Sequence, residues 1–151
     1  MDRNVLEGRS TKIAIECGDE RVSYQQLLER TNRGGNAFRR LGMRREERVL
    51  LLLLDTPEFL YCFFGAIKIG AAPVPTNTLL KPDEYEYVLK DSRAGVVVVS
   101  EALTATGGSN TTGKAQLFTR DRCSRGTGPA PPFFDGSDGF CVSATDARTD
   151  Q

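Results

Sequence analysis

A glycine-rich segment near residue 110 has the spacing of a phosphate-binding loop. The segment GSNTTGKA contains Gly108, Gly113 and Lys114 in the GxxxxGK order of a P-loop. Backbone N–H groups of such a loop cradle phosphates, and its lysine neutralises their charge. Ala115 stands where a P-loop has the Ser or Thr whose hydroxyl binds Mg²⁺, and the residues that follow predict no clear helix. The sequence therefore favours an interpretation without a phosphate site.

Other side chains that commonly carry catalysis are absent or scattered. The chain contains no histidine, which removes the commonest general base and the common partner of a Ser or Cys nucleophile. Its four cysteines include no CxxC pair, so a structural metal is not expected. Cys17 falls in a predicted strand and Cys62 in an apolar helix, where small thiols are ordinary core residues. No residue is therefore assigned a catalytic or metal-binding role.

The elements that would position a site begin with a βαβ unit. Residues 49–54 form an aliphatic run that is typical of a strand covered on both faces of its sheet. The hydroxyl of Thr56 is expected to cap a helix over residues 57–69, and Gly70 ends this helix. A second short strand follows at residues 73–75.

Further elements flank this unit on both sides. Upstream, the pattern predicts a β-hairpin around residues 18–20 and then a helix that Ser23 caps and Gly42 ends. Downstream, Pro82 begins another helix, and residues 96–99 predict a buried strand. Because strands and helices alternate, we expect an α/β fold: a partial layered, mostly parallel sheet with βαβ units and an amino-terminal β-hairpin.

The character of the sequence changes near residue 104. Residues 104–151 have no sustained period of 3.6 or 2 and are rich in Gly, Ser, Thr, Pro, Arg and Asp. Such a composition buries too little apolar surface to offset the entropy of ordering. We therefore expect a folded part over residues 1–103 and a disordered tail over residues 104–151. A frameshift, a misjoined gene end or a replaced terminus would each produce this change, and the composition of the tail favours a frameshift.

Short segments in a fixed order carry a family resemblance. Residues 22–27, VSYQQL, are similar to the motif L(T/S)YxEL, with Val22 and Gln26 as departures, and residues 67–75, IKIGAAPVP, fit LKxGxxxVPxx. Between them, LGMRREERVLLLLLDTPEF resembles a linking segment of the form LGxxxGDRVxxxLxNxPEF. Residues 12–101 thereby resemble the AMP-forming acyl-adenylate enzymes, which include acid–CoA ligases. Within that family, the segments CFFGAIKIG, PVPTNTLLKP and YEYVLKDSRA are most similar to those of benzoate–CoA ligases and close aryl–CoA ligases.

That resemblance implies a reaction and its cofactors. The family activates a carboxylate with ATP and Mg²⁺ to an acyl-adenylate, from which the CoA thiol displaces AMP; the implied substrate is a small aromatic acid such as benzoate. The family's phosphate loop, Mg²⁺-binding Glu, ribose-binding Asp and carboxy-terminal Lys lie beyond the matched region. Thr111 and Thr112 with Gly113 are similar to part of the phosphate loop, but its Pro-Lys-Gly ending is missing. The chain, as a fragment that lacks these groups, is therefore expected to hold no cofactor and to catalyse nothing.

Charge and hydropathy limit the kinds of function that the sequence can have. Basic and acidic side chains are equal at 20 each, so no net field attracts nucleic acid or an anionic membrane. The first residues lack an apolar signal segment, and no run is long enough to span a bilayer, which predicts a cytoplasmic protein. The leading hypothesis is the amino-terminal portion of an AMP-forming aryl–CoA ligase. Two rival hypotheses are a non-catalytic remnant or interaction module that self-associates through exposed sheet edges, and a small P-loop nucleotide hydrolase that uses Lys114.

Overall fold

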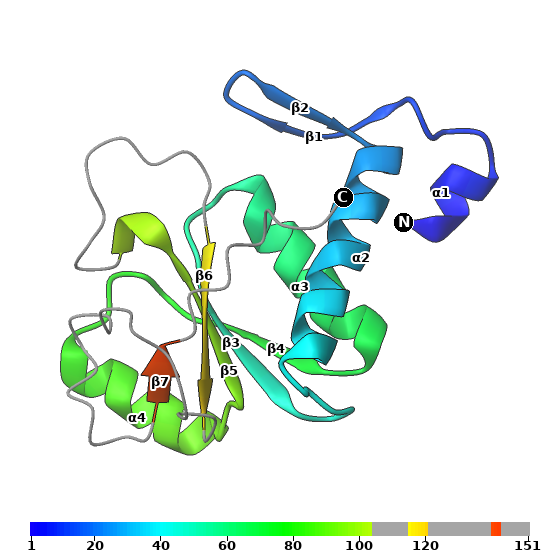
Figure 1. The fold of residues 1–151 in the computed structure, drawn as a ribbon. Coiled ribbons are helices and arrows are strands. Elements are labelled where there is room, and N and C mark those ends of the chain that lie inside the picture. Colours follow the sequence, from blue (N-terminus) through cyan, green and yellow to red (C-terminus); the bar gives the residue numbers. More distant parts are fainter. Residues whose placement is uncertain (104–114, 121–139, 143–151) are drawn as a thin grey trace.

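The computed structural model describes residues 1–103, 115–120 and 140–142. A five-stranded sheet with the order β4-β3-β5-β6-β7 forms its centre (Figure 1). The strands of this sheet are β3 (Arg48–Leu52), β4 (Ala72–Pro75), β5 (Val96–Ser100), β6 (Ala115–Arg120) and β7 (Phe140–Val142). A separate antiparallel hairpin consists of β1 (Ile13–Cys17) and β2 (Glu20–Ser23). The helices are α1 (Asp2–Leu6), α2 (Tyr24–Arg40), α3 (Pro57–Ile69) and α4 (Pro82–Ser92), and a 3₁₀ turn (Glu101–Leu103) follows β5.

The predicted βαβ unit is confirmed. β3 is parallel to β4 on one side and to β5 on the other. Helix α3 ends at Gly70, which has a φ of 82°, the left-handed conformation that glycine adopts without strain. Thr56 precedes this helix as expected, but its hydroxyl makes no capping hydrogen bond, so that prediction was wrong. Pro57 already fixes the first helical φ and brings no N–H that needs a partner, so the helix begins without the hydroxyl.

Both faces of the parallel strands are covered by helices (Figure 1). Alternate side chains of β3 point to opposite faces, as the period of a strand requires. One face packs on α2 and α3 through Val49 and Leu51, and the other packs on α4 through Leu50 and Leu52. All residues of β5 are buried, which confirms the prediction that its valines form an interior strand.

The amino-terminal hairpin packs at one end of α2 and α3. The side chain of Ser23 accepts a hydrogen bond from the backbone of Gln26 at 3.3 Å, and the Gln26 side chain accepts one from Ser23 N–H at 2.9 Å. This capping box was predicted and fixes where the hairpin ends and α2 begins. Val22 then packs with Leu27 and Tyr61 in a small cluster that joins the hairpin to both helices.

Two strands lie where the sequence predicted no regular element. β6 pairs antiparallel with β5, from Val96 opposite Thr119 to Ser100 opposite Ala115, and β7 pairs antiparallel with β6. The main signal of a strand, strict alternation, is missing from AQLFTR, so the pattern alone did not reveal β6. Its ladder instead depends on the open edge of β5, whose backbone groups need partners. The other residues of 104–151, and the expectation of low order for them, lie outside the described part of the chain.

Candidate functional site

The carboxyl ends of β3 and β4 form the candidate site. These two strands are neighbours, yet β3 continues into α3 and β4 into α4, and the two helices cover opposite faces of the sheet. Such a change of side opens a crevice at the carboxyl ends of the strands, where open α/β sheets bind their ligands. The candidate site therefore consists of two loops, residues 53–56 after β3 and residues 76–81 after β4.

The first loop is held from two sides. The N–H of Leu54 donates to Oγ of Ser100 at 2.9 Å, which joins the end of β3 to the end of β5. From the hairpin, Sγ of Cys17 lies 3.8 Å from the carbonyl oxygen of Asp55. The strand ends at Leu52, two residues earlier than predicted, and this leaves Leu54 and Asp55 exposed at the edge. The loop is thus a fixed platform with one exposed carboxylate.

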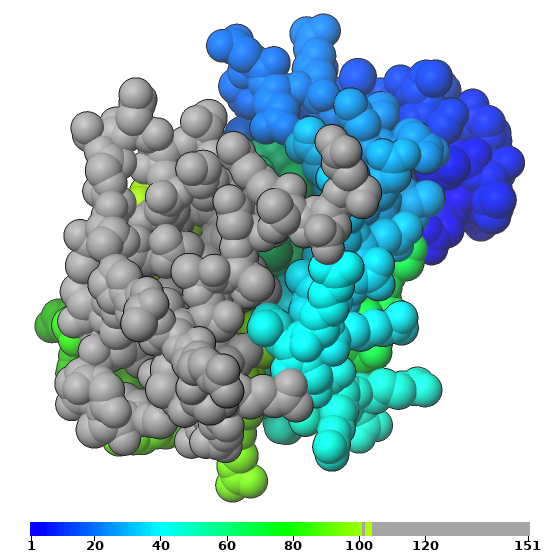
Figure 2. Space-filling model, viewed as in Figure 1, coloured from blue at the N-terminus to red at the C-terminus, as the bar shows by residue number. Residues whose placement is uncertain are grey.

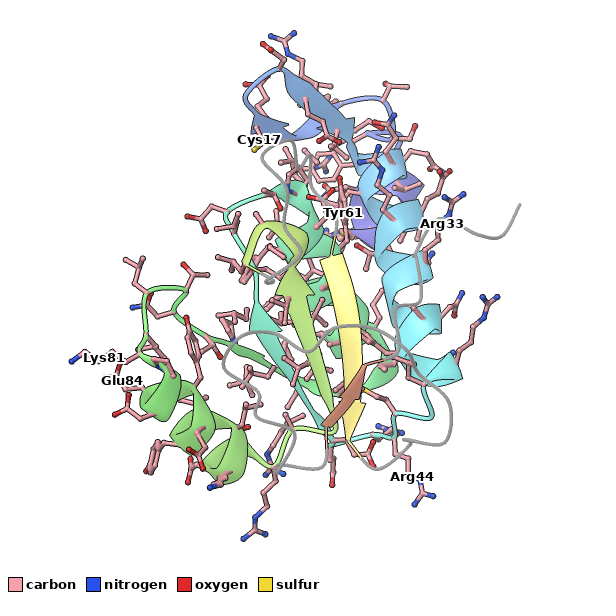
Figure 3. All side chains as sticks on the ribbon, turned by 60° about the vertical axis from the view of Figure 1, so that its left-hand side comes forward. Cys17, Arg33, Arg44, Tyr61, Lys81 and Glu84 are labelled. Atoms are coloured by element: carbon pink, nitrogen blue, oxygen red, sulfur yellow. The ribbon has the colours of Figure 1, made fainter. Side chains whose placement is uncertain are left out.

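The second loop is held by its own side chains. Oδ1 of Asn77 accepts a hydrogen bond from the N–H of Leu79 at 3.0 Å, and the hydroxyl of Tyr85 donates to the carbonyl oxygen of Asn77 at 3.1 Å. Burial raises the pKa of Tyr85, so its hydroxyl keeps its proton at neutral pH and remains a donor. At the start of α4, the Glu84 carboxylate accepts from the N–H of Lys81 at 2.7 Å (Figure 3). These bonds fix the loop and present Leu79 with 87% of its surface exposed.

A second polar cluster ties the hairpin to the helices. Nη1 of Arg30 lies 2.7 Å from Oε1 of Glu20 and 2.8 Å from the hydroxyl oxygen of Tyr61, and the guanidinium lies 5.3 Å from the centre of the Tyr61 ring. The hydrogen bond with Glu20 is the main reason that the pKa of Arg30 is raised, and burial is the main reason that the pKa of Tyr61 is raised. The three residues come from β2, α2 and α3, and Figure 3 labels Tyr61 of this cluster. This geometry holds the hairpin against α2 and α3, because the Arg30 guanidinium binds one group from the hairpin and one from the neighbouring helix.

The start of α3 carries a carboxylate and a thiol. Oε2 of Glu58 is buried and has no hydrogen-bond partner among the described residues. Burial, with a smaller contribution from the Glu58 charge, raises the pKa of Cys62 to about 12. A nucleophilic cysteine needs a lowered pKa, so the Cys62 thiol is unreactive at neutral pH, as expected for a core residue.

The arginines around the end of α2 lie on the surface. Figure 2 shows side chains of the cyan segment, near residues 40–48, projecting from the molecule. The exposed arginines of this segment are Arg39, Arg40, Arg44, Arg45 and Arg48. A carboxylate oxygen of Glu47 accepts a hydrogen bond from the backbone N–H of Arg44 at 2.8 Å. This arrangement agrees with a solvated helix end, where basic groups face the negative end of the helix dipole.

The residues of the phosphate-loop lookalike lie outside the described part of the chain. They are Gly108, Thr111, Thr112, Gly113 and Lys114. The element that follows them directly is strand β6. A P-loop requires a helix there, because the helix N-terminus supplies N–H groups and a favourable dipole to the phosphates. The neighbouring geometry therefore gives no support to a P-loop.

Two kinds of feature were not found among the described residues. Among them, no three His, Cys, Asp or Glu side chains gather where they could hold a metal ion. In the same ranges no helix is long and apolar enough to cross a membrane. Sequence reasoning did not find the bonds that fix the two loops, although Asn77 between two threonines is a common signal of a side-chain-stabilised turn. The candidate site is thus a sheet edge whose two loops are held in place by hydrogen bonds.

Comparison with known proteins finds a matching family model and similar acid–CoA ligases. The family model "AMP-binding enzyme" matches residues 2–129, which is further than the predicted resemblance, ending at residue 101. The chain is 45% identical over 100 residues to a 4-hydroxybenzoate–CoA/benzoate–CoA ligase of Rhodopseudomonas palustris, an alignment that covers 66% of this chain and 19% of the ligase. It is 44% identical over 96 residues to a crotonobetaine/carnitine–CoA ligase of Shigella flexneri, with 62% and 19% covered.

A solved structure agrees with these relatives. The crystal structure of the anthranilate CoA ligase AuaEII in complex with anthranoyl-AMP matches with a TM-score of 0.61 and 46% identity, over 64% of this chain and 18% of that one. The chain spans about a fifth of the length of the curated relatives that it matches. Since the family model covers most of the residues, with the motifs in their order, the chain belongs to the AMP-binding enzyme family.

Proposed function

We propose that this chain is the amino-terminal part of an AMP-forming acid–CoA ligase, and that alone it catalyses nothing. The observation that carries the proposal is the family match over residues 2–129, together with the intact β3–α3–β4 unit. The whole ligase would convert a carboxylate, ATP and CoA to an acyl-CoA, AMP and pyrophosphate. We also propose a cytoplasmic location and no nucleic-acid or membrane partner.

An aromatic acid of the benzoate class is the proposed substrate. Its support is the similarity to two proteins named for aromatic acids, the 4-hydroxybenzoate–CoA/benzoate–CoA ligase and the anthranilate CoA ligase. The crotonobetaine/carnitine–CoA ligase is almost as similar, at 44% against 45%. Relatives named for such different acids share this region nearly equally, so we infer that it supplies scaffold and that acid selection lies in other residues.

The described residues do not fit a Mg²⁺–ATP site. They contain no cluster of three metal-ligating side chains. At the candidate edge, Oδ1 of Asn77, Oγ of Ser100 and the hydroxyl of Tyr85 already bond to backbone groups. ATP, Mg²⁺ and CoA are therefore proposed for the whole ligase, and the role proposed for these residues is to hold the edge on which further residues build the site.

The reading frame tests this proposal. If a frameshift near codon 104 produced the tail, an adjacent frame encodes further alternating strands and helices, then a Ser/Thr/Gly loop that ends in Pro-Lys-Gly. The chain with that frame restored is expected to form aryl-CoA from benzoate, ATP and CoA, measured by chromatography of the product, with crotonobetaine as the competing acid. The present chain is expected to show no benzoate-dependent pyrophosphate exchange. Frames that contain only stops and aperiodic sequence would refute the frameshift.

Calorimetry separates the P-loop hypothesis from this proposal. We expect no saturable ATP binding by the present chain at millimolar nucleotide, because β6 stands where a P-loop has its helix. Lys114→Ala is then expected to leave the titration unchanged. Saturable binding that disappears in Lys114→Ala would instead favour a nucleotide hydrolase.

A further inference from the structure

Strand β4 forms one end of the central sheet. In the described ranges it pairs with β3 and has no strand on its other side. Such an edge ordinarily presents unpaired N–H and C=O groups, and these form a template on which a strand of another molecule can pair. Self-association through exposed edges was one expectation from the sequence. Whether this edge permits it depends on which backbone groups point outward.

The hydrogen bonds to β3 fix the direction of each residue in β4. The N–H groups of Ala72 and Thr76 donate to carbonyl groups of the β3 segment at 2.8 and 2.9 Å. In a parallel ladder the residues that bond to the partner alternate with residues whose backbone groups point away. Val74, opposite Leu50, shares the inward set with Ala72 and Thr76. The residues between them point their backbone groups outward.

Both outward-pointing residues are prolines. Pro73 and Pro75 have no backbone N–H, so the outer edge offers carbonyl acceptors and no donor from either position. An added β-strand must exchange bonds in both directions, and here it would leave its own carbonyl groups without partners. We infer that this edge of the sheet is closed to strand addition by Pro73 and Pro75, which prevents a second copy of the chain from pairing along β4.

Besides its two prolines, β4 has one other protection of its edge, its short length of four residues. Proteins also block exposed edges with charged side chains, β-bulges and covering loops. The sequence of β4, APVP, carries no charged side chain, and the strand is short and regular. Ala72 and Pro75 are exposed, so no described element covers the edge. The two prolines thus remove the donors from an edge that is otherwise protected only by the shortness of the strand. This inference does not depend on the proposed ligase function.

The test restores the missing donors. In Pro73→Val/Pro75→Val, both residues favour a strand and each brings an outward N–H. The double variant is expected to self-associate at a concentration about tenfold or more below that of the unsubstituted chain, in sedimentation equilibrium. Ala72→Val is the matched control, because it also adds a β-branched residue to β4 but its N–H already bonds to β3. This control is expected to associate like the unsubstituted chain.

Two outcomes would overturn the inference. The first is a folded double variant, judged by circular dichroism, that associates no more than Ala72→Val. The second comes from hydrogen exchange in Pro73→Val and Pro75→Val separately, which remains readable if the double variant does not fold. In the monomer, the new amides at positions 73 and 75 are expected to exchange as fast as solvent-exposed amides. Strong protection of either amide would mean that it points to a partner within the chain.

Discussion

The two faces of the parallel sheet are covered in different ways. On one face, α2 and α3 lie side by side, and their backbones touch where glycines meet: a Cβ at Gly65 would lie 2.8 Å from the nitrogen of Gly35. On the other face, α4 is the one α-helix that the described residues supply, and it contacts the strands through Tyr85 and Leu89. We call these the paired-helix face and the single-helix face.

The two faces are expected to differ in the substitutions that they tolerate. Backbone atoms cannot change rotamer, so an added atom at the glycine contact must move a whole helix. Side chains on the single-helix face can relax around a smaller neighbour, and the cost of a substitution depends on how far they do so. The paired-helix face is therefore expected to resist enlargement, and the single-helix face to be the more adaptable layer.

The largest expected effect is that of Gly65→Val. The added side chain would meet the backbone of α2, and we expect a loss of roughly 3 kcal/mol or more in the free energy of unfolding. Urea denaturation followed by circular dichroism measures it. Gly95→Ala is the control, because a Cβ there meets nothing within 4 Å, and it is expected to change stability by about 0.5 kcal/mol or less. Equal losses in the free energy of unfolding in both variants would mean that the contact between Gly35 and Gly65 is no more sensitive to an added side chain than Gly95 is.

The elements of both faces could be predicted because their signals are local. The capping box at Ser23, the glycine stop at Gly70 and the valine run of β5 each act within a few residues. A sequence pattern reads such signals directly. The α/β class of the fold followed from the alternation of these elements.

The contacts between elements could not be read in the same way. Gly35 and Gly65 look like weak points in the middle of two helices, and only the crossing of the helices gives them a role. The bond from Tyr85 to Asn77 depends on the path of a loop. The pairing of β6 depends on the open edge of β5, a property that its own residues do not encode. For the candidate site, motif order predicted the family, and long-range bonds decided the local geometry.

On the single-helix face, Leu89→Ala tests adaptability. Leu89 is 5% exposed, and its truncation is expected to lower the free energy of unfolding by about 2–3 kcal/mol, toward the small end of the range for such truncations. Tyr87→Ala truncates a larger side chain on the same helix, but Tyr87 is 69% exposed, and we expect a change of about 0.5 kcal/mol or less. A loss of about 5 kcal/mol for Leu89→Ala would mean that this face is as rigid as the other.

The paired-helix face also carries a pH dependence through Cys62. Its pKa rises from 9.0 to about 12 on folding, so above pH 9 the unfolded chain loses the thiol proton and the folded chain keeps it. The contribution of this thiol to the free energy of unfolding is therefore complete below pH 9 and is lost as pH rises from 9 toward 12. Between pH 7 and pH 10 the expected loss from this group is about 1.4 kcal/mol. Denaturation of Cys62→Ala is expected to show a correspondingly smaller loss in the free energy of unfolding between pH 7 and pH 10. Identical pH profiles for the variant and the unsubstituted chain would contradict this prediction.

The smallest effect is expected where the single-helix face meets the candidate site. Tyr85→Phe removes the hydroxyl that holds the Asn77 carbonyl and keeps the buried ring, so a loss of about 1 kcal/mol in the free energy of unfolding is expected. Tyr87→Phe removes a hydroxyl from an exposed ring on the same helix and is expected to change nothing measurable. Hydrogen exchange adds a local readout, because loss of the tie is expected to speed exchange at Leu79 more than in β5. Unchanged exchange at Leu79 would mean that Asn77 alone fixes the loop, through the bond from its Oδ1 to the Leu79 N–H.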